Sequence, residues 1–170
     1  MSMEHKSYAF DWQAFERELY PCIIQALETG DSQEIIAFIE QNRDQLSDPY
    51  EGAPLNDRWQ MMLSNRDVHE YGDYALTKFY DPSQAMGVGE AWLELSERLP
   101  ARAARALLGE ALGPEGNRFD PGRMGSYFQC PEQVLASLEA LANVSEAEVG
   151  AFREFLESCA VRGLGVYVTF

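Results

Sequence analysis

Apolar residues recur at helical spacing near the start of the chain, from Trp12 to Leu27. The run follows Asp11, a residue type that favours helix N-caps, and it stops at Gly30, a residue type that favours the position after a helix. Pro21 lies inside the run, where a proline removes a backbone hydrogen bond and clashes with the preceding turn. The pattern therefore predicts a kinked helix or two abutting helices.

A second helix is predicted directly after Gly30. Asp31 and Glu34 have the spacing of a capping box, and the apolar residues of 35–39 supply a buried face. Two helices joined by so short a connection should form a hairpin. Residues 46–58 are rich in proline, glycine and small polar residues, which predicts a loop.

The rest of the chain continues the helical pattern as far as its last residues. Apolar spacing predicts further helices over residues 67–79, 91–99, 100–112, 131–141 and 146–159. Pro100 and Pro131 stand at first helical positions, where the missing N–H would have no helical partner in any case. Ser145 and Glu148 match a capping box for the last helix.

The final residues, 164–170, alternate between larger apolar residues and Gly, Tyr or Thr, which is typical of a half-buried strand. A single strand needs a partner, and residues 7–10 or 127–128 are the candidates. We therefore expect residues 1–170 to form one mainly helical α+β domain whose small sheet includes the C-terminal strand. A chain of this length can bury a core large enough for one domain.

The formal net charge of −15 divides unevenly along the chain. Residues 1–85, the acidic half, hold 16 acidic and 6 basic residues, whereas residues 86–170 hold 12 and 7. Such a field repels phosphate backbones, so the charge argues against binding of nucleic acid. It would attract a basic protein, and the alternative is that the charge serves only solubility.

Two features bear on the setting of the protein. The sequence contains no apolar run of the length that crosses a membrane, and its first residues lack the apolar core of a signal peptide. Among the basic residues only Lys6 and Lys78 are lysines, which is typical of a GC-rich bacterial genome. The sequence thus predicts a bacterial cytoplasmic protein without a membrane partner.

No signature of a cofactor, a metal or a covalent intermediate stands out. Cys22, Cys130 and Cys159 are far apart and lack metal-ligand spacing, so we interpret them as reduced thiols. The stretch 87–89 lacks the third glycine of a dinucleotide loop, and no phosphate-loop lysine or nucleophile elbow is present. The sequence therefore predicts neither cofactor nor metal, and it favours a protein without catalytic activity.

Histidine chemistry is restricted to few positions. His69 stands four residues before Asp73, so on a helix both side chains share a face and could ligate one ion or handle a proton. The alternative is structural, because Asp67 and Glu70 have the spacing of a capping box on a solvated helix.

Residues 113–130 form the most informative segment, because long irregular loops in compact domains are often functional. The segment concentrates the residue types that dominate binding hot spots. Its candidate binding residues are Arg118, Asp120, Arg123 and Tyr127, to which we add His69. The alternative is that Phe119 and Phe128 plug the core while Arg123 pairs with a carboxylate.

Short motifs in the second half resemble the YfbM-like family of small bacterial proteins. They are residues 89–92 with the apolar helix behind Trp92, the glycine-bearing stretches 107–109 and 112–113, and residues 127–134 around Pro131. Cys130 stands where that pattern would have a capping serine or threonine. The resemblance implies an α+β fold and a bacterial cytoplasmic setting, and it implies no activity.

Three hypotheses about function remain. The first is a non-catalytic binding protein, such as an immunity-type or regulatory inhibitor of a basic partner. The second is an enzyme or ligand-binding protein with a pocket beside residues 113–130, in which His69 or a carboxylate with a perturbed pKa acts as a base and Arg123 holds an anionic substrate. The third is a homodimer or larger oligomer whose sheet continues through the terminal strand.

Overall fold

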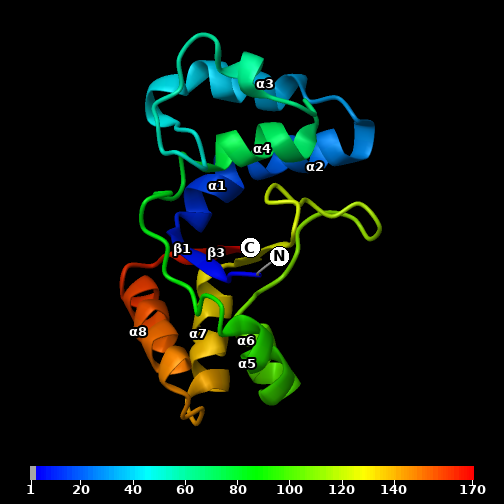
Figure 1. Cartoon of the computed structure of the whole chain (residues 1–170). Coiled ribbons are helices and arrows are strands. Elements are labelled where there is room, and N and C mark those ends of the chain that lie inside the picture. Colours follow the sequence, from blue (N-terminus) through cyan, green and yellow to red (C-terminus); the bar gives the residue numbers. More distant parts are fainter. Residues whose placement is uncertain (1–2) are drawn as a thin grey trace.

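The computed structural model describes residues 3–170 and has three layers, with the sheet between two groups of helices (Figure 1). The helices on one side of the sheet are α1 (Trp12–Glu18), α2 (Tyr20–Thr29), α3 (Gln33–Gln41) and α4 (Val68–Leu76). Those on the other side are α5 (Trp92–Arg98), α6 (Ala101–Ala106), α7 (Pro131–Leu141) and α8 (Ala147–Val161). Two 3₁₀ turns, η1 (Arg43–Gln45) and η2 (Trp59–Met62), flank the loop between α3 and α4.

The sheet has three antiparallel strands, β1 (Lys6–Phe10), β2 (Ser126–Gln129) and β3 (Gly165–Thr169). Their order is β1-β3-β2, so the C-terminal strand pairs with both partners expected for it. The prediction of a half-buried strand is wrong, because helices cover both of its faces. An oligomer whose sheet continues through β3 is also ruled out, since both edges of this strand are already paired.

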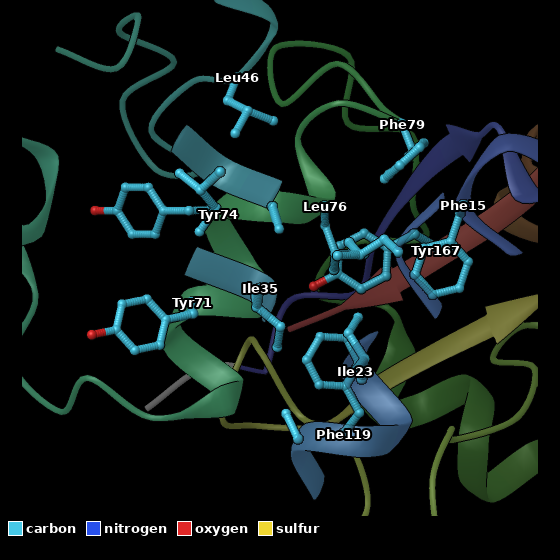
Figure 2. Close-up of a cluster of buried hydrophobic side chains, with 14 of the residues drawn as sticks. Phe15, Ile23, Ile35, Leu46, Tyr71, Tyr74, Leu76, Phe79, Phe119 and Tyr167 are labelled. Atoms are coloured by element: carbon cyan, nitrogen blue, oxygen red, sulfur yellow. The ribbon is translucent and has the colours of Figure 1, made fainter. Parts of the chain in front are cut away.

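Each face of the sheet contributes to its own hydrophobic core. Phe10, Phe128 and Tyr167 project into the core toward α1–α4 that Figure 2 draws, and the Tyr167 ring stacks on that of Phe128. Val166 and Val168 project toward α5–α8. One small sheet therefore joins two helical layers into a single, mainly helical α+β domain, as the sequence predicts.

Local signals placed most helices correctly. Pro21 stands in the first turn of α2 and splits the first apolar run into two helices. The Asp67 side chain accepts the backbone N–H of Glu70 at 3.0 Å and caps α4. Within residues 3–170 no helix is long and apolar enough to span a membrane.

Several helix ends differ from the predictions. Asp31 accepts the backbone N–H of Gln33, so α3 begins after Ser32 instead of at a capping box on Asp31. The helix after Pro100 ends at Ala106, because the chain turns there to reach β2. The N-cap of α8 is Glu146 and not Ser145.

Gly109 lies where the chain after α6 passes close to β2. Its φ is +103°, and a Cβ there would lie 2.4 Å from the carbonyl oxygen of Phe128. We expect Gly109→Ala to lower the free energy of unfolding by about 1–3 kcal/mol more than Gly116→Ala does, since backbone and new methyl group clash. Gly116 also has a positive φ, +82°, but nothing lies within 4 Å of its Cβ position. Urea unfolding would measure both losses, and equal losses would contradict the close approach.

Candidate functional site

The residues that the sequence singled out in 113–130 serve mostly to fix this segment. Asp120 donates its backbone N–H to Nδ1 of His69 at 3.0 Å, and the His69 ring stacks on Phe119. The Asp120 carboxylate accepts the hydroxyl of Ser126 at 2.9 Å. Arg118 is exposed and donates to the carbonyl of Gly113. His69 and Asp120 therefore anchor the segment to α4.

The structure does not gather the five predicted residues into one pocket. Tyr127 packs against the core on the α5–α8 side of the sheet, near Phe170, whereas His69 lies on the α1–α4 side. A site that uses both side chains, as the version of the enzyme hypothesis with His69 as the base required, is not formed. Arg123 alone reaches a cavity, and its Nη2 atom also binds both carboxylate oxygens of Asp67, at 2.8 and 2.9 Å.

Two adjoining cavities lie on the α4 side of the sheet. The first, the acidic cavity, has a volume of about 390 Å³, and its lining includes Asp48, Tyr50, Glu51, Glu70, Asp73, Tyr74 and Arg123. The second, the tyrosine cavity, has a volume of about 290 Å³, and its lining includes Lys6, Tyr8, Tyr50, Asp73, Tyr80 and Tyr167. Tyr50 and Asp73 line both, so these two side chains separate the cavities.

Asp73 is a carboxyl group in a buried stretch of α4. Only 5 % of the residue is exposed, and its neighbours in α4 from Tyr71 to Leu76 are all buried. Burial raises the pKa of Asp73 to about 7, and the charges of Asp48 and Glu70 act in the same direction. The Tyr50 hydroxyl lies near this carboxyl and opposes the rise of its pKa. Asp73 can therefore carry a negative charge or a proton near neutral pH.

Tyrosine rings form the walls of the second cavity. The ring centroids of Tyr8 and Tyr80 are 4.7 Å apart, and those of Tyr80 and Tyr167 are 5.2 Å apart. Burial raises the pKa values of Tyr80 and Tyr167 well above the usual value, so both hydroxyls stay protonated. The walls thus present neutral aromatic faces, which attract cations.

Carboxylates fix the loop segments that line the acidic cavity and its entrance. Asp48 accepts the backbone N–H groups of Tyr50 and Glu51 at 2.7 and 3.0 Å, and the Tyr74 hydroxyl also bonds to it. Glu70 accepts three consecutive backbone N–H groups from residues 64–66, at 2.6 to 2.9 Å. The hydrogen bonds to Glu70 lower its pKa, so this group is ionised near neutral pH. The entrance is therefore both rigid and negative.

Metal binding does not explain this arrangement of side chains. Among the residues that the structure describes, no three His, Cys, Asp or Glu side chains are placed to hold one ion. His69 and Asp73 share α4, but His69 uses Nδ1 to bind the segment 113–130. What the site offers chemically is a buried carboxyl group, aromatic faces and a negative entrance, which together favour an organic cation.

Sequence reasoning missed most of this site. Tyr8, Tyr50 and Tyr80 were not singled out, and Asp73 was considered only as a partner of His69. One signal was present, because Asp73 interrupts an apolar helical segment at a position where the helix faces the core. The tyrosines carry no comparable signal, since their segments meet only in the folded chain.

Comparisons with known proteins add no relative. No protein-family model, curated protein or solved structure matches this chain.

Proposed function

We propose that this protein binds a basic protein partner without catalysing a reaction, as an immunity-type or regulatory inhibitor would. The observation that carries the proposal is the acidic cavity, which Asp48, Glu51 and Glu70 line together with the buried Asp73 carboxyl. The basic residue of this lining, Arg123, is bound to Asp67. The resemblance noted in the sequence supports a bacterial cytoplasmic setting as part of this proposal.

Charge supports the proposal at two ranges. At long range, the net charge of −15, most of it in residues 1–85, speeds encounter with a basic surface. At short range, the tightest contacts are those between a cation and a carboxylate that is shielded from water. The acidic cavity supplies such a carboxylate beneath a negative entrance.

A defined peptide tests this function. We expect an arginine-rich peptide to bind and its glutamate-rich counterpart not to bind in isothermal titration calorimetry. Raising the salt concentration should weaken binding, because dissolved ions screen the attraction between exposed charges. At about 0.15 M ionic strength this attraction already fades beyond a Debye length of about 8 Å. Failure of the arginine-rich peptide to bind at low salt, or binding that ignores salt, would contradict the proposal.

A variant of Glu51 tests whether the peptide binds at the entrance of the acidic cavity. Glu51→Gln removes one exposed charge from the entrance, and we expect it to weaken binding of the peptide about two- to five-fold, as rim charges do. Glu157→Gln makes the same charge change at an exposed position of α8, in the other helical layer, and serves as the matched control. Equal effects of the two variants would mean that only net charge matters and that the entrance is not the contact.

A further inference from the structure

We propose that the two cavities take up the guanidinium group of an arginine side chain, which displaces the Tyr50 hydroxyl from Asp73 and lies against the tyrosine rings. The inference rests on the proposed function and names the group of the partner that anchors it. It starts from the cavities themselves, which share the buried carboxyl group of Asp73 and place tyrosine side chains beside it.

Tyr50 is the movable part of the wall between the cavities. It is 76 % exposed and comes from the loop between α3 and α4, whereas Tyr8 and Tyr167 are 8 % and 1 % exposed and belong to the sheet. Its side chain lines both cavities beside the Asp73 carboxyl, so the ring stands between the two volumes. A rotation of Tyr50 toward solvent would join the two volumes into one space with Asp73 at its middle.

The charges that line the acidic cavity and the tyrosine cavity determine from which side a cation enters. The acidic cavity carries Glu51 and Glu70 near its opening, whereas the tyrosine cavity carries the ammonium group of Lys6. A cation is therefore attracted to the first opening and repelled from the second. Arg123 does not block the first opening electrostatically, because Asp67 compensates its charge.

Shape and solvation favour a guanidinium over an ammonium group. A guanidinium is planar and weakly hydrated, stacks on aromatic rings and binds a carboxylate through two parallel hydrogen bonds. An ammonium group is compact and strongly hydrated, so it loses more on entering a cavity walled by Tyr80 and Tyr167. A cavity with aromatic walls and a buried carboxyl group therefore suits arginine better than lysine.

The proton on Asp73 sets a pH dependence. Asp48 and Glu70, which are acidic, and Arg123, which is basic, face the carboxyl, and Lys6 lines the same cavity. The remaining titratable groups around it are the hydroxyls of Tyr8, Tyr50, Tyr74, Tyr80 and Tyr167. Because the free carboxyl holds a proton below about pH 7, a cation must compete with that proton at lower pH. Binding should therefore strengthen as the pH rises from about 6 to about 8.

The test compares arginine-rich and lysine-rich peptides of equal length on the full chain, by calorimetry at low salt. We expect the arginine-rich peptide to bind more tightly, and Asp73→Asn to weaken its binding at least about ten-fold, since a charge-assisted hydrogen bond in a shielded site is lost. Asp57→Asn removes the same charge from an exposed loop position and is the matched control. Asp73→Asn should also abolish the rise of affinity with pH.

Tyr50→Phe tests whether the Tyr50 hydroxyl competes with the ligand or whether the ring only packs in the wall between the cavities. It keeps the ring but removes the hydroxyl that competes for Asp73, so we expect binding to become tighter by about two-fold or more. If the arginine-rich peptide binds with salt dependence while Asp73→Asn and Asp57→Asn bind it equally, Asp73 does not hold the guanidinium group. The proposed function would stand in that case. If no basic peptide binds the wild-type protein, the proposed function itself fails.

Discussion

Replacing Phe128 by alanine is expected to lower the free energy of unfolding by about 3–5 kcal/mol. Phe128 is 1 % exposed and lies on β2, where its ring stacks on Tyr167 at 4.9 Å and on Phe15 at 5.8 Å between centroids. Truncation to alanine removes both stacking contacts and leaves a cavity between the sheet and α1. Few other single changes should cost as much, because this ring joins strand, helix and loop at once.

Urea unfolding followed by tryptophan fluorescence measures this loss. Leu135→Ala on α7 is the control, because Leu135 is 57 % exposed and its truncation opens no cavity. We expect the Phe128 variant also to bind the arginine-rich peptide less well, since Tyr167 rests on Phe128 and forms a wall of the tyrosine cavity. A loss of stability no larger than that of the control would show that the core tolerates the gap.

The sequence predicted the elements of this fold wherever a local signal determines them. Pro21 can stand in a first helical turn but not in a helix interior, so it separated α1 from α2. The alternation of residues 164–170 identified β3 and restricted its partners to two segments, both of which pair with it. Such signals act within a few residues, which is why they can be recognised without the fold.

The wrong predictions concern features that tertiary contacts decide. Burial on both faces of β3 depends on having helices on either side of the sheet, and alternation of residue types does not report this. The early end of α6 depends on Gly109 meeting the Phe128 carbonyl, a contact between segments far apart in the sequence. Ser145 matches the capping pattern, yet the chain begins α8 after Glu146.

The candidate site was predictable only in part, for the same reason. The sequence indicated the acidic half and the segment 113–130, and Arg123 of this segment does line the acidic cavity. Tyr8, Tyr50 and Tyr80 come from β1 and two separate loops, and only their common position beside α4 makes them a wall. An ionisable residue inside an apolar helical segment, here Asp73, is the signal that would have directed attention to the site.

Asp73→Asn is expected to stabilise the protein at alkaline pH and to leave its stability nearly unchanged in acid. The folded protein raises the pKa of Asp73 from 3.8 to about 7, so folding favours the protonated carboxyl. Stability linked to this proton is complete below about pH 4 and is lost as the pH rises toward 7, because the unfolded chain ionises freely. Asparagine is neutral at every pH and escapes the loss, which amounts to at most about 4 kcal/mol.

Urea unfolding of the wild type and the variant at about pH 4 and about pH 8 measures the difference, and Asp57→Asn provides the exposed control. A constant difference between Asp73→Asn and wild type across this range would show that the carboxyl is not held protonated by the fold. A bound guanidinium would offset the cost of the buried charge, so the arginine-rich peptide should raise the unfolding midpoint of the wild type at alkaline pH far more than that of Asp73→Asn. The ionised Asp73 destabilises the free protein, and a bound cation would offset this cost. Binding then explains why residue 73 is an aspartate, because an asparagine there would give a more stable fold.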